Sequence, residues 1–163
     1  MLLKSNSIGK EFHLSIILGW PFDTSVALAK IVFSGILEKY PNLKLIAAHS
    51  GGMIPYFIER IDGFHKMFKE NDRGLDEAGI LIQPSKYFKK MYYDTAIFYQ
   101  PALMCVYSLV GSEGLILGTD YPYGPFEGKQ FIKQSLDSVK KLQIKNNEKQ
   151  KILGENAKRL LRL

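Results

Sequence analysis

Two residues whose side chains suit proton transfer or metal binding each follow a short apolar run. His49 ends the apolar run 45–48 and precedes Ser-Gly-Gly, and Asp120 ends the run GLILGT at 114–119. An imidazole exchanges protons near neutral pH, and an imidazole and a carboxylate on neighbouring strand ends can share a metal ion or a substrate. The alternatives are a hydrogen-bonded core histidine and an aspartate that only forms a turn before Tyr121-Pro122.

The apolar runs before His49 and Asp120 are typical of parallel strands that are covered on both faces. Small residues after His49 allow a tight turn, and apolar residues at helical spacing predict a helix from Met53 to Phe68. Barrel and doubly wound enzymes carry their catalytic residues at the carboxyl ends of such strands. We therefore predict that His49 and Asp120 lie at the carboxyl ends of adjacent or next-adjacent parallel strands.

The remaining pattern alternates helices and strands. Residues 16–21 favour a short strand or an extended segment stopped by Pro21, and a helix is expected from Asp23 or Thr24 to about Tyr40. Further predicted elements are a loop at 71–83, a short helix at 84–90, a strand at 91–96, a helix from Pro101 through Leu109, and helices at about 127–142, 147–153 and 155–162, the second of these capped by Asn146 or Asn147. This order predicts right-handed parallel units, although three strands are few for an independent parallel sheet.

Length and composition predict one globular, soluble domain over residues 1–163, with 46% hydrophobic residues. No run approaches the roughly 18 apolar residues of a membrane span, and the apolar start is too short for a secretory signal, so we expect no membrane contact. The lone Cys105 excludes an internal disulfide framework and indicates a cytoplasmic protein. The net charge of +6 suggests nucleic acid, but the excess Lys and Arg lie on expected solvated helix faces without a nucleic-acid motif, which argues against that partner.

Several segments resemble the amidohydrolase-related family typified by aminocarboxymuconate-semialdehyde decarboxylase and the resorcylate-type decarboxylases. The matching segments are GWP with Thr24, IVFSGILEKYPNLKLIAAHSGGMIPYFIERIDG, KYFKKMYYDTAIF, GLILGTDYPYG and ILGENAKRLL, in the order of the family. AHSGG and GTDYP together form a specific pair. The resemblance implies an α/β fold, the C-terminal part of a TIM-type (β/α)8 barrel of the metal-dependent hydrolase superfamily, with the N-terminal strands absent.

The resemblance also implies roles for individual residues. His49 matches the family's acid/base, and Asp120 matches a ligand of a divalent metal that is usually zinc. Arg60 matches an arginine that reaches a neighbouring subunit's site and holds a substrate carboxylate, although a surface arginine on an amphipathic helix is the alternative. Trp20, just before the first predicted long helix, is either a substrate contact or a packing aromatic.

Parts of the family pattern are missing from the chain. It contains no His-x-His pair and no His-Pro, which mark the family's other metal ligands, so we expect an incomplete metal site that does not hold zinc tightly. His13 matches no family position, and His65 lies in the predicted helix after His49. The simplest account is that the chain is the last part of a longer barrel. Its origin would then be one piece of a split gene, a truncated reading frame or a degraded copy.

Three functions follow. The first is a metal-dependent decarboxylase of an aromatic or muconate-type carboxylic acid, inactive as this fragment alone. The second is a metal-dependent hydrolase of lactone or amide bonds on the same fold. The third is a non-catalytic remnant or one subunit of a split barrel. The expected partners are a small carboxylate substrate and either further copies of the chain or a missing N-terminal half.

Overall fold

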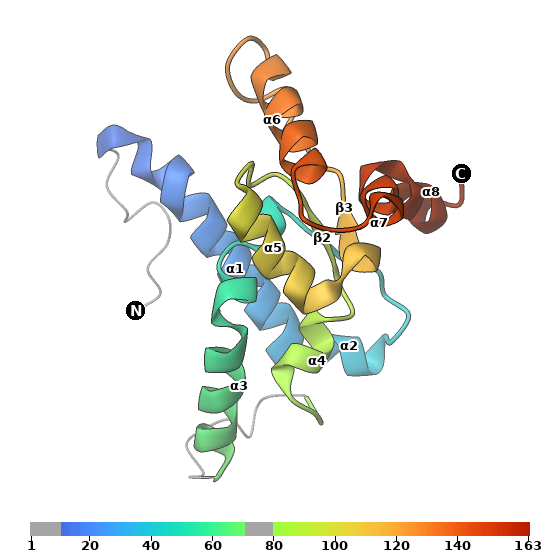
Figure 1. Cartoon of the computed structure of the whole chain (residues 1–163). Coiled ribbons are helices and arrows are strands. Elements are labelled where there is room, and N and C mark those ends of the chain that lie inside the picture. The colour runs from blue at the N-terminus through green and yellow to red at the C-terminus, as the bar shows by residue number, and fades with distance from the viewer. Residues whose placement is uncertain (1–10, 71–79) are drawn as a thin grey trace. The chain divides into compact units, whose positions relative to one another are not determined.

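The computed structural model describes residues 11–70 and 80–163 (Figure 1). Their elements fall into two compact units. Of the described residues, 11–44, 51–70 and 80–88 form a helical unit, and 45–50 and 89–163 form a sheet unit. The single domain predicted over 1–163 stays a prediction.

The helical unit is built on two long helices, α1 (Trp20–Phe33) and α3 (Ile54–Glu70). Two short helices, α2 (Ile36–Lys39) and α4 (Pro84–Phe88), complete it. Its core consists of the buried side chains Leu28, Val32, Leu37, Ile54, Ile80, Tyr87 and Phe88. The predicted helices after Met53 and over 84–90 are thus confirmed, and most of the predicted 71–83 loop lies outside the described residues.

The segment before α1 differs from the sequence prediction. Residues 16–21 are helical, with a π-helical turn at Ser15–Gly19 running directly into α1, so the predicted strand or extended segment is wrong. Pro21 lies in the first turn of α1 but inside the continuous helix over 15–33, so it does not stop that helix although it donates no backbone hydrogen bond to the π-helical turn before it. At the other end, α1 ends at Phe33 because Gly35 takes a left-handed backbone (φ 73°), and α2 follows separately.

The continuous helix over Ser15–Phe33 has 19 residues and, by length and composition alone, is apolar enough to cross a membrane. This corrects the expectation that no segment reaches such a length. One helix of this kind is weak evidence for a membrane span, because core helices of soluble proteins and signal sequences pass the same test. The expected absence of a membrane contact therefore stays a prediction.

The sheet unit contains three short parallel strands, β1 (Ile46–Ala47), β2 (Tyr92–Asp94) and β3 (Leu115–Ile116), in the spatial order β1-β2-β3. The register pairs Ile46 with Tyr92 and Tyr93 with Leu115. The strands predicted at these three places are confirmed, and so is their parallel order. They are shorter than the apolar runs suggest.

Helices separate and follow these strands. They are α5 (Gln100–Val110), α6 (Lys129–Lys140), α7 (Asn146–Gln150), a π-helical turn at Lys151–Glu155 and α8 (Asn156–Leu161). The predicted Asn146 or Asn147 cap is wrong, because the N-cap of α7 is Lys145, whose backbone N–H donates to the Glu148 carboxylate at 3.1 Å. The buried Asn156 amide donates to the carbonyls of Ser112 and Leu115, both at 2.7 Å, and so fixes the start of β3.

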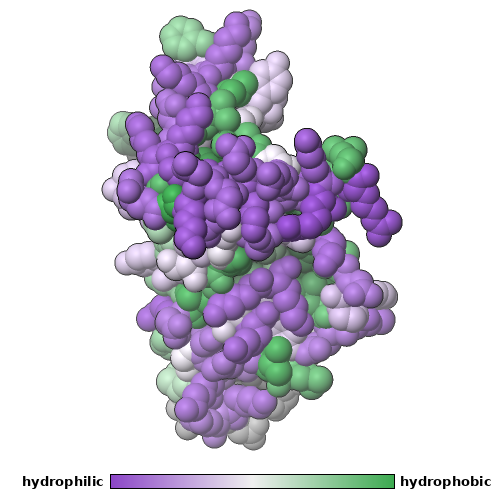
Figure 2. All heavy atoms as spheres, turned by 45° about the vertical axis from the view of Figure 1, so that its right-hand side comes forward, coloured by the Kyte–Doolittle hydropathy of each residue, from purple (hydrophilic) through white to green (hydrophobic). Residues whose placement is uncertain are grey.

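The surface carries the charged side chains expected from the composition. The face drawn in Figure 2 is mostly hydrophilic and is interrupted by separate hydrophobic side chains. Scattered apolar side chains of this kind are normal on a folded protein and identify no site by themselves.

Candidate functional site at the strand ends

The structure places His49 and Asp120 at the same edge of the sheet. His49 follows β1 after one residue, and Asp120 follows β3 after three. Because β1 and β3 both pair in parallel with β2, their carboxyl ends meet at one edge, two strand spacings or about 10 Å apart. The predicted placement on next-adjacent parallel strands is confirmed. Both residues are half-buried, and their catalytic and metal-binding roles stay predictions.

The strand between them contributes Asp94, the last residue of β2. Its Oδ2 accepts a hydrogen bond from the backbone N–H of His49 at 3.1 Å, and its Oδ1 accepts one from the N–H of Ser50 at 2.7 Å. In return, the Ser50 hydroxyl donates to the Asp94 carbonyl at 2.8 Å. The carboxylate of β2 therefore binds the turn that carries His49. We call His49, Ser50, Asp94, Thr95 and Asp120 the strand-end cluster.

The backbone of the cluster lies in the left-handed region at three residues other than glycine. The φ angles are 51° at His49, 53° at Ser50 and 61° at Asp120. Such conformations cost on the order of 1–3 kcal/mol each and persist only where surrounding contacts hold them. His49 and Asp120, to which the sequence assigns chemistry, are thus among the non-glycine residues with positive φ; outside the cluster the described residues with this backbone are Phe12, His13, Phe98, Phe126, Glu127 and Arg162.

Buried hydroxyls support the segment that leads to Asp120. Thr95 is fully buried, and its Oγ1 accepts a hydrogen bond from the Gly118 N–H at 3.1 Å. The hydroxyls of Thr95 and Ser135 lie 2.8 Å apart, and Ser135 Oγ donates to the Gly118 carbonyl at 2.6 Å. Both polar groups of the Gly118 backbone are thereby satisfied, which fixes the chain two residues before Asp120.

Burial raises the pKa of the Asp94 carboxyl above its ordinary value, because desolvation disfavours the charged form. Hydrogen bonds from the N–H groups of Ser50, Ala96 and His49 act in the opposite direction, as does the charge of the His49 side chain, without cancelling the effect of burial. The environment of Asp94 therefore favours the neutral form of its carboxyl more than water does.

The other two predicted site residues belong to the helical unit. Arg60 is exposed on α3, with its guanidinium carbon 4.5 Å from the centre of the Phe64 ring. Trp20 is the first residue of α1 and is 42% exposed. The structure thus brings His49 and Asp120 into one unit, and Arg60 and Trp20 into the other.

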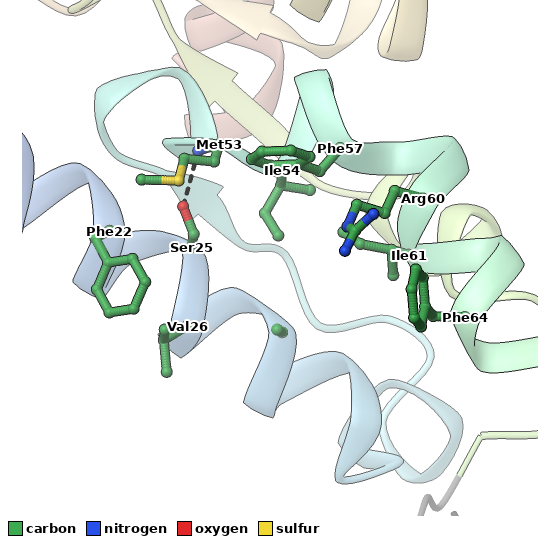
Figure 3. A pocket seen from close by; sticks show the side chains of 10 residues that line it. Phe22, Ser25, Val26, Met53, Ile54, Phe57, Arg60, Ile61 and Phe64 are labelled. Atoms are coloured by element: carbon green, nitrogen blue, oxygen red, sulfur yellow. Dashed lines mark hydrogen bonds between the residues drawn. The ribbon is translucent and has the colours of Figure 1, made fainter. Parts of the chain in front are cut away.

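Arg60 borders a hollow between α1 and α3 (Figure 3). The volume of this helix hollow is about 380 Å³. Apart from Arg60, its walls are nearly all apolar: Phe22, Val26 and Ala29 from α1, and Met53, Ile54, Phe57, Ile61 and Phe64 from α3 or just before it. The exception is Ser25, whose hydroxyl donates to the Pro21 carbonyl at 2.7 Å and accepts from the Met53 N–H at 2.8 Å.

The donors needed for a metal centre are not assembled in the described residues. No group of three or more His, Cys, Asp or Glu side chains within 11–70 and 80–163 is placed to hold a metal ion. A catalytic zinc site uses about three protein ligands, whereas the sequence assigns only Asp120, with His49 as a weak second. The described residues therefore do not by themselves fit a metal centre.

Sequence reasoning missed Asp94, Thr95 and Ser135. Asp94 and Thr95 lie in KMYYDTAIF, a segment that supported the family resemblance but received no role. A polar pair near the end of the strand predicted over 91–96 was the available signal, because strand ends share an edge in a parallel sheet. Ser135 gave no such signal, since one serine in an amphipathic helix resembles a surface residue.

Comparisons with known proteins identify the family of the chain. The amidohydrolase family model matches residues 12–163. The chain is 33% identical over 156 residues to 2-amino-3-carboxymuconate-6-semialdehyde decarboxylase of Dictyostelium discoideum, covering 94% of this chain and 40% of that protein. It is 27% identical over 148 residues to gamma-resorcylate decarboxylase of Polaromonas sp., covering 88% and 42%. The chain thus spans about two fifths of the length of these curated relatives.

The fold comparison gives the same result. The crystal structure of dihydroxybenzoic acid decarboxylase from Polaromonas sp., which holds manganese and the inhibitor 2-nitroresorcinol, matches with a TM-score of 0.79 and 24% identity. The match covers 99% of this chain and 47% of that one. This confirms the predicted fold class, part of a TIM-type barrel. The family match includes the long apolar helix, all three segments of the strand-end cluster and the C-terminal helices, and the chain belongs to the amidohydrolase family.

Proposed function

We propose that the whole protein decarboxylates an aromatic or muconate-type carboxylic acid, and that this chain supplies the proton donor. The observation that carries the proposal is the position of His49 at the carboxyl end of β1, on a strained turn held by Asp94. Relatives named as decarboxylases of a muconate semialdehyde and of a resorcylate support this substrate class.

The proposed step is a proton transfer followed by loss of carbon dioxide. The protonated imidazole of His49 gives its proton to the ring or alkene carbon that carries the carboxylate. The bond from that carbon to the carboxylate then breaks, and its electron pair restores the double bond while carbon dioxide leaves. The product carries hydrogen in place of the carboxylate, and the neutral imidazole regains a proton from solvent.

Arg60 is the proposed carboxylate-binding residue, and Trp20 a further substrate contact. A guanidinium is always charged and can bind a carboxylate with two parallel hydrogen bonds. The exposure of Arg60 on α3 leaves it available to a neighbouring subunit. We accordingly propose a homo-oligomer in which Arg60 of one copy serves the site of another.

The whole enzyme is proposed to use a divalent cation, either zinc or manganese, with Asp120 as one of its ligands. The manganese in the dihydroxybenzoic acid decarboxylase structure supports a divalent metal. Because further ligands would have to come from outside the described residues, we expect the purified chain, dialysed against trace zinc or manganese, to hold far less than one metal ion per chain. Elemental analysis measures this, and near-stoichiometric metal would contradict it.

Release of carbon dioxide tests the function. Protein produced from the complete coding region is supplied with manganese or zinc and offered dihydroxybenzoates, carboxyvanillate-type acids and muconate semialdehydes. His49→Gln should reduce turnover by about 10²–10⁴-fold, the usual contribution of a positioned acid or base. His13→Gln, at an exposed histidine without an assigned role, is the matched control.

The same assay separates the alternatives. Lactone or amide cleavage without carbon dioxide would favour the hydrolase. No turnover of any of these substrates by the metal-loaded complete protein would favour a non-catalytic chain.

A further inference from the structure

Asp94 makes hydrogen bonds to both His49 and Ser50, although the proposed function gives it no role. We propose that Asp94 is a positioning residue for His49, and that its carboxylate holds His49 and Ser50 in the left-handed backbone from which the imidazole acts. The inference rests on the proposed function of His49. It adds a residue of β2 to a site that the sequence assigned to the ends of β1 and β3.

The first argument is the direction of the hydrogen bonds. Consecutive N–H groups, those of His49 and Ser50, converge on the two oxygens of one carboxylate. Successive N–H groups that converge in this way form a small anion-binding concavity, and here the anion is a side chain 44 residues away in the sequence. The ionised carboxylate accepts a charge-assisted hydrogen bond on each of its two oxygens. A neutral side chain of the same size, asparagine, has only one acceptor oxygen and cannot make both bonds.

The second argument is that the carboxylate is itself held in place. The N–H of Ala96 donates to Oδ1 at 3.1 Å, which fixes the side chain against its own strand. On the other side lies Gly118, where an added Cβ would be 2.7 Å from the Asp94 Cβ. A carboxylate confined by β2 and by the segment after β3 has little freedom to turn away, so it can impose its geometry on the His49 turn.

The third argument is that the turn needs an external restraint. His49 and Ser50 both carry side chains, and both have positive φ, which residues with a Cβ seldom adopt in succession. Glycine at position 50 would adopt this backbone freely, but the chain has serine there. The Ser50 hydroxyl is used in the same contact, because it donates to the Asp94 carbonyl.

Nuclear magnetic resonance of the 163-residue chain tests the positioning without any need for activity. In Asp94→Asn, the amide protons of His49 and Ser50 should exchange about tenfold faster or more, and the His49 side chain should average over several rotamers. The strand amides of Tyr93 and Ile116 should keep their protection. Asp137→Asn, a change at another half-buried aspartate of the sheet unit, is the matched control and should leave all of these signals unchanged.

A rescue experiment separates positioning from general support of the fold. Ser50→Gly relieves the strain at one of the two residues, so the double variant Asp94→Asn with Ser50→Gly should recover part of the lost His49 order. In the complete protein, Asp94→Asn should lower kcat for carbon dioxide release by about tenfold or more with little change in KM, and Ser50→Gly should recover part of that loss.

Two outcomes would overturn the proposal. Either the His49 and Ser50 amides stay unchanged in Asp94→Asn, or protection is lost throughout the sheet and Ser50→Gly restores nothing. If the amides and rotamers respond as expected while the complete wild-type protein releases no carbon dioxide, the positioning stands and the proposed function fails.

Discussion

The strand-end cluster and the helix hollow differ in the kind of contact that each is built from. In the cluster, an imidazole, two carboxylates and two hydroxyls come from three strand ends, and directed hydrogen bonds join His49, Ser50 and Asp94. In the hollow, two helices present nearly continuous apolar walls around about 380 Å³, with one guanidinium at the border.

The difference shows why cavity shape alone is a poor guide to chemistry in this chain. A well-formed apolar pocket with a few polar groups is the customary first hypothesis for a binding site, and that rule selects the helix hollow. Strained backbone and a carboxyl with a raised pKa occur instead at the strand ends. Apolar walls of this kind suit packing or docking, whereas proton transfer requires the groups of the cluster.

The largest predicted effect concerns the packing of α1 against the start of α3. Gly52 has a φ of 60°, and an added Cβ would lie 2.2 Å from the Pro21 carbonyl oxygen and 2.5 Å from Ser25 Oγ. Gly52→Ala should therefore lower the free energy of unfolding by about 2–5 kcal/mol, measured by urea unfolding. Gly63→Ala in α3, where an added Cβ meets nothing within 4 Å, should be neutral or stabilising. Equal stability of the two variants would contradict this account of the hollow.

Arg60 allows a test of whether the border of the hollow serves the chemistry. In the assembled enzyme, Arg60→Ala should weaken binding of the carboxylate substrate by about 1.5–3 kcal/mol, because a charge-assisted contact is lost. The Michaelis constant measures this. Stability should change little, since the Arg60 contact with Phe64 is an exposed cation–π pair. Lys66→Ala removes another exposed cation of α3 and is the control; an unchanged KM and kcat in Arg60→Ala would leave Arg60 as a surface residue.

The buried hydroxyls of the sheet unit provide the next test. Thr95→Val keeps the shape of the side chain but leaves the Gly118 N–H and the Ser135 hydroxyl each short of a partner. The free energy of unfolding should fall by about 1–3 kcal/mol, the usual cost of unsatisfied buried polar groups. Ser108→Ala, at an exposed hydroxyl bonded only within its own helix, should change it by less than about 0.5 kcal/mol. A neutral Thr95→Val would show that water replaces the lost bonds.

The same contrast explains which features the sequence could predict. The ends of strands can be predicted from sequence. An apolar run predicts the strand, and the polar residue that follows it, His49 or Asp120, is thereby placed at the carboxyl end of that strand. The partner of that residue is not visible, because Asp94 is 45 positions from His49 and only the pairing of β1 with β2 brings them together. Local signals were also wrong at two places: Pro21 lies inside a continuous helix where a stop was predicted, and Lys145 takes the cap position expected for Asn146 or Asn147.

The smallest predicted effect is the pH dependence of stability that Asp94 contributes. Its pKa is raised by burial in the folded state, so between the ordinary value, about 3.9, and the raised value the folded chain binds more protons than the unfolded chain. The contribution of Asp94 to stability is therefore fully present below about pH 3.9 and is lost as the pH rises through the raised pKa. Across that interval, the free energy of unfolding falls by at most about 1.4 kcal/mol for each pH unit.

Urea unfolding of the wild type and of Asp94→Asn from pH 3.5 to 7 measures this contribution, because the difference between the two proteins removes most contributions of other groups. The stability of the wild type relative to Asp94→Asn should be greatest at the acid end. Glu113→Gln should show the opposite sign, because hydrogen bonds from Lys151 and Arg159 lower the pKa of Glu113, whose contribution is lost as the pH falls. The opposite result would be a stability of the wild type, relative to Asp94→Asn, that increases with pH. It would mean that the hydrogen bonds from His49, Ser50 and Ala96 outweigh burial, so that the folded state lowers the pKa of Asp94 and does not raise it.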